Sequence, residues 1–401
     1  MNANLRKLQE QIRKPLLISK KENLLYLTGR SFINGWLLVM PAHNSSQPPL
    51  KIRGGVKGSC SPLKVRGARG VIFLGDGLEK VEKIHTDKLE NVRMYLDGYR
   101  KLQLEDSFSF AEANVLKAHL GPVKLEPVKS PVEKLREIKD VREIGCMRAS
   151  GKIVEKVWKQ VKKDLLKKTW TEAGLAARIV DVGRGFGSAG VSFDPIVAAG
   201  ANAATPHHIP GEEKLSAGEP IIIDFGFKYR GYCSDFTRTV FLKRAPGKWA
   251  EIYNQVEKAY LQSIQILSSR ASVSDRGNPG CNTTGLLPAI GGQASQTPRN
   301  DLQIKASDVY QKAVEILAEK NLDKYFVHNL GHGCGLEIHE SPSLSAVSKD
   351  VLRCGMVFSI EPGVYLPKAG GIRIEDLVYL DHSKAKRFIF SATSLKENIL
   401  K

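Results

Sequence analysis

Two aspartates flank a short turn in the C-terminal half of the chain. Asp224 ends the apolar run PIIID, Asp235 precedes the β-rich run FTRTVFL, and Tyr229-Arg230-Gly231 between them is typical of a hairpin turn. With the turn centred between Tyr229 and Arg230, the two aspartates face each other with Cβ atoms about 4.5–5.5 Å apart. Carboxylates this close in apolar sequence are destabilising unless a cation lies between them. The pair therefore favours a metal site, although an aspartate that is protonated or faces solvent would also account for it.

Three more residues of metal-ligand type occur in similar surroundings. Glu361 ends an apolar run in VFSIEPGVY, Glu375 lies inside GGIRIEDLVYL, and His332 is bracketed by glycines in NLGHGCGLEIHE. Each residue alone is ordinary, but together four acidic groups and one histidine in apolar or glycine-rich sequence predict a metal-binding cluster. Thr237, two residues after Asp235, lies on the same strand face and is expected to hold one of the carboxylates.

These motifs resemble the pita-bread metallopeptidases, in particular the group of Xaa-Pro dipeptidase (prolidase) and Xaa-Pro aminopeptidase. The matching blocks, in the family's order, are FDPIVAAGANAATPHHIP, IIIDFGFKYRGYCSDFTRT, HNLGHGCGLEIHESP, VFSIEPGVY and GGIRIED. The interval of 11 between the two aspartates is also the family's. The resemblance implies an α+β fold. A smaller creatinase-like α/β domain at residues 1–125 would precede a pita-bread catalytic domain at residues 126–401.

The resemblance implies that the acidic cluster holds two divalent ions. The implied metal ligands are Asp224, Asp235, His332, Glu361 and Glu375. Asp235 and Glu375 would bridge the ions. A carboxylate-rich set suits Mn, and Co, Zn or Fe remain open. Paired ions activate a water molecule for hydrolysis, and Glu361 is the expected general acid/base.

Three histidines and one arginine match further pocket positions of the family. His207 precedes Asp224 by 17 residues, and His339 in LEIHE matches a histidine that contacts the substrate and the tetrahedral intermediate. The implied catalytic residues are His207, His339 and Glu361. The implied substrate-binding residues are His207, His328, His339 and Arg373. His208 lies one residue off the family register and carries less weight.

We expect a hydrolase that cleaves Xaa-Pro bonds in small peptides, with an aminopeptidase slightly favoured over a dipeptidase. Methionine aminopeptidase is an alternative because it shares the five ligands, but it normally lacks a preceding domain of this type. A non-catalytic pita-bread binding protein with a basic surface is the alternative from another class. The net charge of +18 can attract nucleic acid, yet no RNA-binding aromatic signature or zinc finger accompanies it. We therefore expect no nucleic-acid partner. We also expect no membrane partner, and we expect the protein to form a homodimer.

Helices and strands must alternate to bring these residues together. The periodicity predicts helices over residues 133–166, 171–183, 249–268 and 307–320, with Thr171 as an N-cap. Strand-rich segments between and after them predict a largely antiparallel sheet. Residues 16–40 read as two strands, and residues 122–131 as a linker. Residues 41–70 read as a loop, and residues 271–303, rich in Gly and Pro, as a disordered insertion.

The bulk properties agree with a two-domain protein of 401 residues. No apolar run of about 18 residues is present, and the charged N-terminus has no secretory pattern. The six cysteines are dispersed without a CxxC pair, which fits free thiols in a reducing compartment. We therefore expect a cytoplasmic protein.

Overall fold

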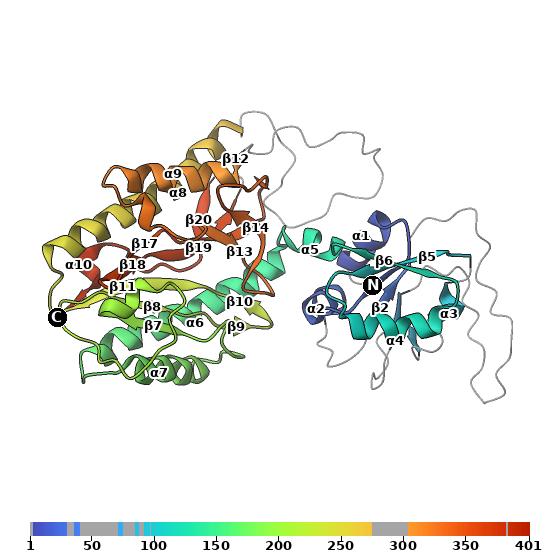
Figure 1. Cartoon of the computed structure of the whole chain (residues 1–401), viewed down its shortest axis with the longest axis horizontal. Coiled ribbons are helices and arrows are strands. Elements are labelled where there is room, and N and C mark those ends of the chain that lie inside the picture. The colour runs from blue at the N-terminus through green and yellow to red at the C-terminus, as the bar shows by residue number, and fades with distance from the viewer. Residues whose placement is uncertain are drawn as a thin grey trace. The chain divides into compact units, whose positions relative to one another are not determined.

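The computed structural model of the chain describes residues 3–29, 36–40, 71–74, 85–87, 92–96, 98–274, 304–381 and 384–401. Two compact units divide the chain, Met1–Arg136 and Glu137–Lys401 (Figure 1). The predicted loop at 41–70 and residues 275–303 of the predicted insertion lie outside the described residues. Within those residues, no helix combines the length and the apolar character needed to cross a membrane.

The N-terminal unit, in its described residues, is a mixed sheet with helices. Its strands are β1 (Leu16–Ile18), β2 (Trp36–Val39), β3 (Val71–Leu74), β4 (His85–Asp87), β5 (Lys101–Glu105) and β6 (Lys124–Val128). Its helices are α1 (Ala3–Gln11), α2 (Lys21–Thr28), α3 (Val92–Tyr95), α4 (Phe110–Leu120) and α5 (Pro131–Arg136). The strand order is β4-β3-β2-β1-β5-β6, with β1–β5, β5–β6 and β3–β4 parallel.

Two predictions for this unit are wrong. The first apolar run of residues 16–40 was predicted to be a strand, but only β1 is one. The rest of the run forms helix α2, which buries Leu24 and Leu27 and is capped by Gly29 with φ 74°. The predicted linker at 122–131 contains β6. Pro127 is tolerated there because β6 is the edge strand of the sheet, where one row of N–H groups needs no partner strand.

The C-terminal unit is built on a larger, mainly antiparallel sheet. In chain order, the first strands of the unit as a whole are β7 (Ile196–Ala199), β8 (Ile221–Asp224), β9 (Lys228–Tyr229), β10 (Tyr232–Cys233), β11 (Phe236–Leu242) and β12 (Ile304–Lys305). The next are β13 (Gly331–Gly333), β14 (Glu340–Leu344), β15 (Val351–Leu352), β16 (Val357–Ile360) and β17 (Gly363–Leu366). The last are β18 (Gly370–Arg373), β19 (Glu375–Leu380), β20 (Ala385–Arg387) and β21 (Ile399–Leu400). The main path runs β14-β13-β16-β19-β11-β8-β7.

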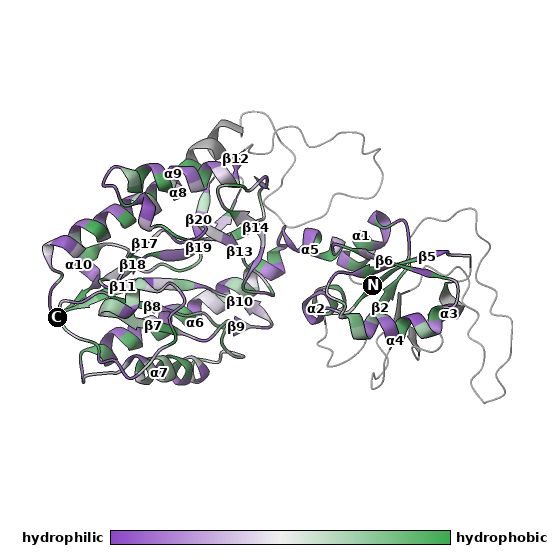
Figure 2. Ribbon diagram, in the orientation of Figure 1, coloured by the Kyte–Doolittle hydropathy of each residue, from purple (hydrophilic) through white to green (hydrophobic). Residues whose placement is uncertain are grey.

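Helices cover this sheet in two pairs. They are α6 (Val141–Leu165), α7 (Glu172–Gly185), α8 (Gly247–Ser274) and α9 (Ala306–Ala318), with the short α10 (Leu395–Asn398) and the 3₁₀ helices η2 (Gly200–Ala204) and η3 (Asp323–Tyr325). Figure 1 shows α6–α7 and α8–α9 on opposite sides of the strands, and each pair buries its own hydrophobic cluster. Figure 2 shows hydrophobic residues along the strands and mixed polarity on the helices, as burial of one helix face requires.

The helix predictions hold with local changes. Thr171 caps α7 by accepting from the Gly174 backbone N–H. The segment 133–166 is two helices, because Asp140 begins α6 with a capping box that includes Glu143. Residues 271–274 of the predicted insertion continue helix α8.

The aspartate hairpin has a different register from the predicted one. Arg230 and Gly231 both have positive φ, so the turn centres between them and Tyr229 pairs with Tyr232. Asp224 therefore pairs with Thr237 rather than with Asp235. Because Asp235 and Thr237 are two residues apart, the two aspartates are diagonal neighbours on one face of the sheet.

Gly183 tests the packing of α7 behind this hairpin. A Cβ at Gly183 would lie 2.0 Å from the buried Phe227 ring, whereas one at Gly185 in the same helix meets nothing within 4 Å. Gly183→Ala is expected to lower the free energy of unfolding by about 1–3 kcal/mol through overpacking. The control Gly185→Ala should be neutral or stabilising by at most about 1 kcal/mol. Urea unfolding of both variants measures this, and equal effects would contradict the contact.

Candidate metal centre

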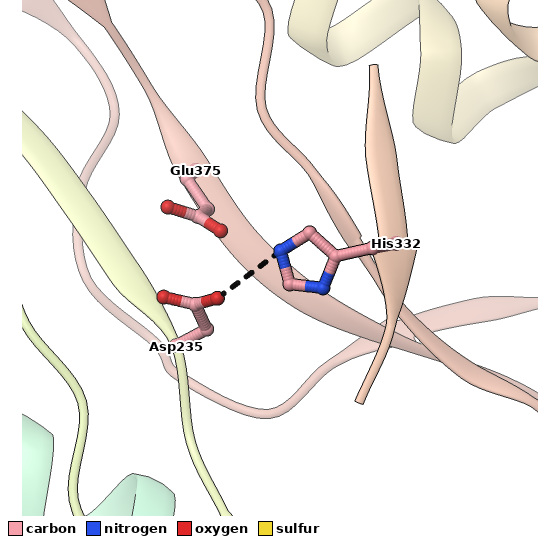
Figure 3. A group of neighbouring side chains, drawn as sticks. All are labelled: Asp235, His332 and Glu375. Atoms are coloured by element: carbon pink, nitrogen blue, oxygen red, sulfur yellow. Dashed lines mark ion pairs between the residues drawn. The ribbon is translucent and has the colours of Figure 1, made fainter. Parts of the chain in front are cut away.

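Three ligand-type side chains from distant parts of the chain converge on the main sheet. Asp235 directly precedes β11, Glu375 begins β19, and His332 is central in β13. Strand β19 pairs with β11 and β16, and β16 pairs with β13. One ligand atom from each residue lies within 4.8 Å of the others, and Figure 3 shows the three side chains pointing toward one another. This spacing fits a shared cation.

His332 presents its Nε2 to the acidic groups. Its Nδ1 lies 3.1 Å from the Gly333 carbonyl oxygen, which can only accept a hydrogen bond, so Nδ1 carries the proton. Burial lowers the pKa of His332, which favours the neutral ring. The Nε2 lone pair then faces Asp235 Oδ2 at 3.5 Å and Glu361 Oε1 at 3.3 Å. Three electron-rich atoms facing one another are the arrangement that a bound cation stabilises.

Glu361 lies just beyond the end of β16 and is held from two sides. Its backbone N–H donates to the Leu330 carbonyl, and its Oε1 accepts from Ser359 Oγ at 2.9 Å. The same Ser359 hydroxyl accepts from the His332 backbone N–H at 3.0 Å. Ser359 thus ties two predicted ligands together.

Asp224 forms a buried ion pair with Arg373. The Arg373 guanidinium donates to Asp224 Oδ2 at 2.6 Å, and both side chains are almost fully buried. Asp224 is nevertheless close to Asp235. After burial, the charge of Asp224 is the strongest influence that raises the pKa of the Asp235 carboxyl well above its usual range. The structure therefore brings all five predicted ligands into one region.

The donor set fits a divalent cation. Asp224 Oδ1 and Glu375 Oε1 are buried and have no hydrogen-bond partner among the residues that the structure describes. Burial, followed by the charge of Asp235, raises the pKa of Glu375 well above its usual range, and burial raises that of Glu361. As predicted, Thr237 holds a carboxylate, because its Oγ1 donates to Glu375 Oε2 at 2.5 Å. Orphaned oxygens in a crowd of buried carboxylates are what metal ligation resolves.

The predicted pocket residues surround this cluster. The ring of His339 packs edge-on against His332, with centroids 4.3 Å apart. His328 Nε2 lies 2.8 Å from the Tyr365 hydroxyl, which accepts from Arg373 at 2.9 Å. His207 lies close enough to lower the pKa values of both His328 and His339, in each case after the larger effect of burial.

Tyr365 and Ser359 are site residues that the sequence prediction missed. Tyr365 reaches Arg373 because β17 pairs with β18, placing Tyr365 opposite Gly371, two residues before Arg373. The runs EPGVYL and GGIRIE on either side of Pro367-Lys368 are a hairpin pattern that could have revealed this neighbour. His208, given little weight from the sequence, contacts Glu172 at 2.8 Å instead of the cluster.

The variant Glu375→Gln separates the effect of this carboxylate on metal binding from its effect on the free energy of unfolding. A carboxyl whose pKa is raised in the folded protein binds its proton more tightly there than in the unfolded chain. Its destabilising effect therefore begins near the unfolded pKa of about 4.3 and grows as the pH rises toward the folded pKa. The neutral amide of Glu375→Gln avoids this cost at every pH.

In chelated protein at about pH 8, Glu375→Gln is expected to raise the thermal midpoint by a few degrees, with a smaller gain near about pH 5. Wild-type protein should gain stability on adding a divalent cation, and the variant should gain less. Thermal scans with chelator and with metal test this, with the exposed Glu251→Gln as control. A chelated variant less stable than wild type at pH 8 would contradict the electrostatic account.

Known proteins match this chain over most of its length. A Xaa-Pro dipeptidase of Pyrococcus horikoshii is 28% identical over 393 residues, covering 96% of this chain and 97% of that protein. The peptidase YqhT of Bacillus subtilis is 30% identical over 299 residues, covering 74% of this chain and 75% of the YqhT chain. The crystal structure of the prolidase from Pyrococcus horikoshii superposes with a TM-score of 0.76 at 25% identity, over 98% of this chain and 100% of the prolidase. These likenesses confirm the predicted pita-bread fold with its preceding domain.

A family model agrees with them. The model of metallopeptidase family M24 matches residues 145–278 and 300–382, which include all five predicted ligands. Together with the buried carboxylate and histidine cluster, this match confirms a metal-dependent peptidase. The chain belongs to metallopeptidase family M24.

Proposed function

We propose that the chain is an exopeptidase that hydrolyses Xaa-Pro peptide bonds. The names of relatives that match nearly its whole length support this substrate class. The observation that carries the proposal is the convergence of Asp235, His332 and Glu375, with histidines placed around them. Methionine aminopeptidase stays the nearest alternative, and peptide substrates of different sequence separate the two.

Two divalent ions are proposed at this centre, with Mn as the first candidate and Co, Zn or Fe as alternatives. The proposed ligands are Asp224, Asp235, His332, Glu361 and Glu375. Four carboxylates offset the charge of two divalent ions, which removes the like-charge repulsion inside the cluster. When bound, such ions supply Lewis acidity, which polarises the scissile carbonyl and lowers the pKa of water.

Glu361 is proposed to move the proton during hydrolysis. Burial raises the pKa of its carboxyl above its usual value, which is the direction that favours uptake of a proton. Its Oε1 is held by Ser359, so its second oxygen remains to accept the proton of the attacking water and to return it to the leaving nitrogen. A proline nitrogen has no hydrogen in the peptide and must gain one when the bond breaks.

The surrounding residues are proposed to bind the peptide. Burial lowers the pKa of His339 and of His328, so both rings stay neutral near pH 7 and can donate to a carbonyl oxygen. His207 is proposed to contact the substrate from the loop that follows η2. The Arg373 guanidinium donates to Asp224, to the Tyr365 hydroxyl and to the Pro206 carbonyl. We propose that it holds Asp224 and these pocket residues in position.

The length of the preferred peptide decides between dipeptidase and aminopeptidase. Both activities share the sequence motifs, an aminopeptidase is slightly favoured, and the names of the relatives include Xaa-Pro dipeptidases and Xaa-Pro aminopeptidases. The homodimer and the cytoplasmic location expected from the sequence also remain proposals.

A metal add-back assay tests the proposed function. Chelated protein should be inactive and should regain activity with Mn, Co, Zn or Fe on Xaa-Pro peptides. A Xaa-Pro dipeptide and a Xaa-Pro tripeptide, compared by kcat/KM, identify the preferred length, and Xaa-Ala peptides serve as controls. Equal turnover of Xaa-Ala and Xaa-Pro substrates, or release of N-terminal Met alone, would refute the proposed specificity.

Asp235→Asn tests the ligand at the centre of the cluster. The amide keeps the shape of the side chain but loses the charge that two cations require. The loss of several kcal/mol of transition-state stabilisation corresponds to a fall in kcat/KM of at least about 100-fold. The exposed Asp194→Asn is the matched control and should keep wild-type activity. Near-normal hydrolysis by Asp235→Asn would remove Asp235 from the proposed mechanism.

A further inference from the structure

The loop that carries His207 is exposed and irregular. It continues from the 3₁₀ helix η2 to about residue 211, without a strand or helix after Ala204. The side chain of Ile209 is 85% exposed, so this part of the loop is not held by a hydrophobic core. A side chain that contacts substrate needs a fixed position, because small displacements lower the rate steeply. The loop therefore needs polar anchors.

Glu172 supplies such an anchor. It is the first residue of α7, its side chain is fully buried, and it accepts four hydrogen bonds from the segment 199–211. Oε1 accepts from Ala199 N at 2.8 Å and from Asn202 Nδ2 at 3.1 Å. Oε2 accepts from Gly211 N at 3.1 Å and lies 2.8 Å from His208 Nε2. Both ends and the middle of the loop thus meet at one carboxylate.

The carboxylate is charged in this position. Burial alone would raise the pKa of Glu172, but the donors from Ala199, His208, Gly211 and Asn202 together lower it below its usual value. The backbone reinforces the contact, because the Glu172 N–H donates to the Glu213 carbonyl and the next N–H of α7 donates to the Gly211 carbonyl. The first turn of α7 and the end of the loop therefore hold each other.

His207 lies between two fixed residues. On one side, the Pro206 carbonyl accepts from Arg373 at 3.1 Å, and Arg373 is bonded to Asp224 at 2.6 Å. On the other side, His208 contacts Glu172. The His207 ring is exposed and lies near His328 and His339. Its direction is set by its two neighbours rather than by its own packing.

We propose that Glu172 is a positioning residue of the peptidase, which fixes the 199–211 loop through His208 and so directs His207 toward the substrate. This inference rests on the proposed function for the role of His207. Glutamine cannot replace Glu172, because its NH₂ group would face two N–H donors where the carboxylate oxygen accepts both. Glutamine can replace His208, because its amide nitrogen also donates.

Two measurements on the full-length protein test the proposal. Hydrogen exchange of the 199–211 amides reports the anchoring without any need for activity. Metal-loaded kinetics on a Xaa-Pro dipeptide and a Xaa-Pro tripeptide report the positioning. The variants are Glu172→Gln, His208→Ala, His208→Gln and His207→Ala, with the exposed Glu212→Gln, directly after the segment 199–211, as control. Thermal midpoints and metal content verify that each variant is folded and loaded.

Glu172→Gln and His208→Ala should speed exchange in 199–211 and lower kcat/KM roughly 10- to 100-fold. His208→Gln should restore both, and Glu212→Gln should change neither. In the His207→Ala background, His208→Ala should cause no further loss, because the residue that it positions is already absent.

Unchanged exchange in both anchor variants would overturn the proposal. So would an equal loss of activity from His208→Ala with and without His207, because Glu172 would then act by another route. A metal-loaded wild-type protein that cleaves neither peptide would refute the proposed function, and the exchange data would still decide whether Glu172 anchors the loop.

Discussion

Like-charge crowding in a buried place is the constraint on which the rest of this structure depends. Asp235, Glu375 and His332 each place one ligand atom within 4.8 Å of the others. The charges of Asp224 and Glu361 add to the negative electrostatic potential there. Such a cluster is unfavourable in the apolar interior unless cations offset it. The antiparallel pairing of β11, β19 and β16 nevertheless forces these groups together. The two helical pairs supply the hydrophobic burial that keeps this sheet in place.

Three of the four acidic groups also have a partner that fixes their orientation. Arg373 holds Asp224, Thr237 holds Glu375, and Ser359 holds Glu361. These contacts leave Asp224 Oδ1 and Glu375 Oε1 without a protein partner among the described residues. In Asp224 and Glu375, one carboxylate oxygen is thus positioned by the protein and the other is available to a cation, which is how outer contacts orient metal ligands. The same logic extends outward to Glu172, whose partners lie in the loop of His207 rather than in the cluster.

The resemblance of five ordered motifs to a known family predicted most of this site, and strand alternation predicted the position of Thr237. Asp235, His332 and Glu375 converge as expected, Asp224 and Glu361 lie beside them, and Thr237 lies on the predicted face. The predicted hairpin register was wrong because the position of the turn depends on Arg230 adopting positive φ. For a residue other than glycine, composition does not reveal that conformation. Helix α2 was read as a strand because a short apolar run fits either element.

Contacts distant in sequence were the part that the sequence could not predict. His328 meets Tyr365, 37 residues further along the chain, and Glu172 meets partners 27 to 39 residues away. A glutamate at a helix start is ordinarily explained by the helix dipole, so nothing in its sequence context indicated a second role.

The buried acidic cluster is proposed to hold a pair of cations. Diffraction from crystals grown with Mn, with anomalous data and elemental analysis of the same protein, tests it most directly. We expect two anomalous peaks per chain among the carboxylates and His332, and two ions per chain in solution. Peaks elsewhere in the molecule, or an intact cluster that takes up no metal, would contradict it.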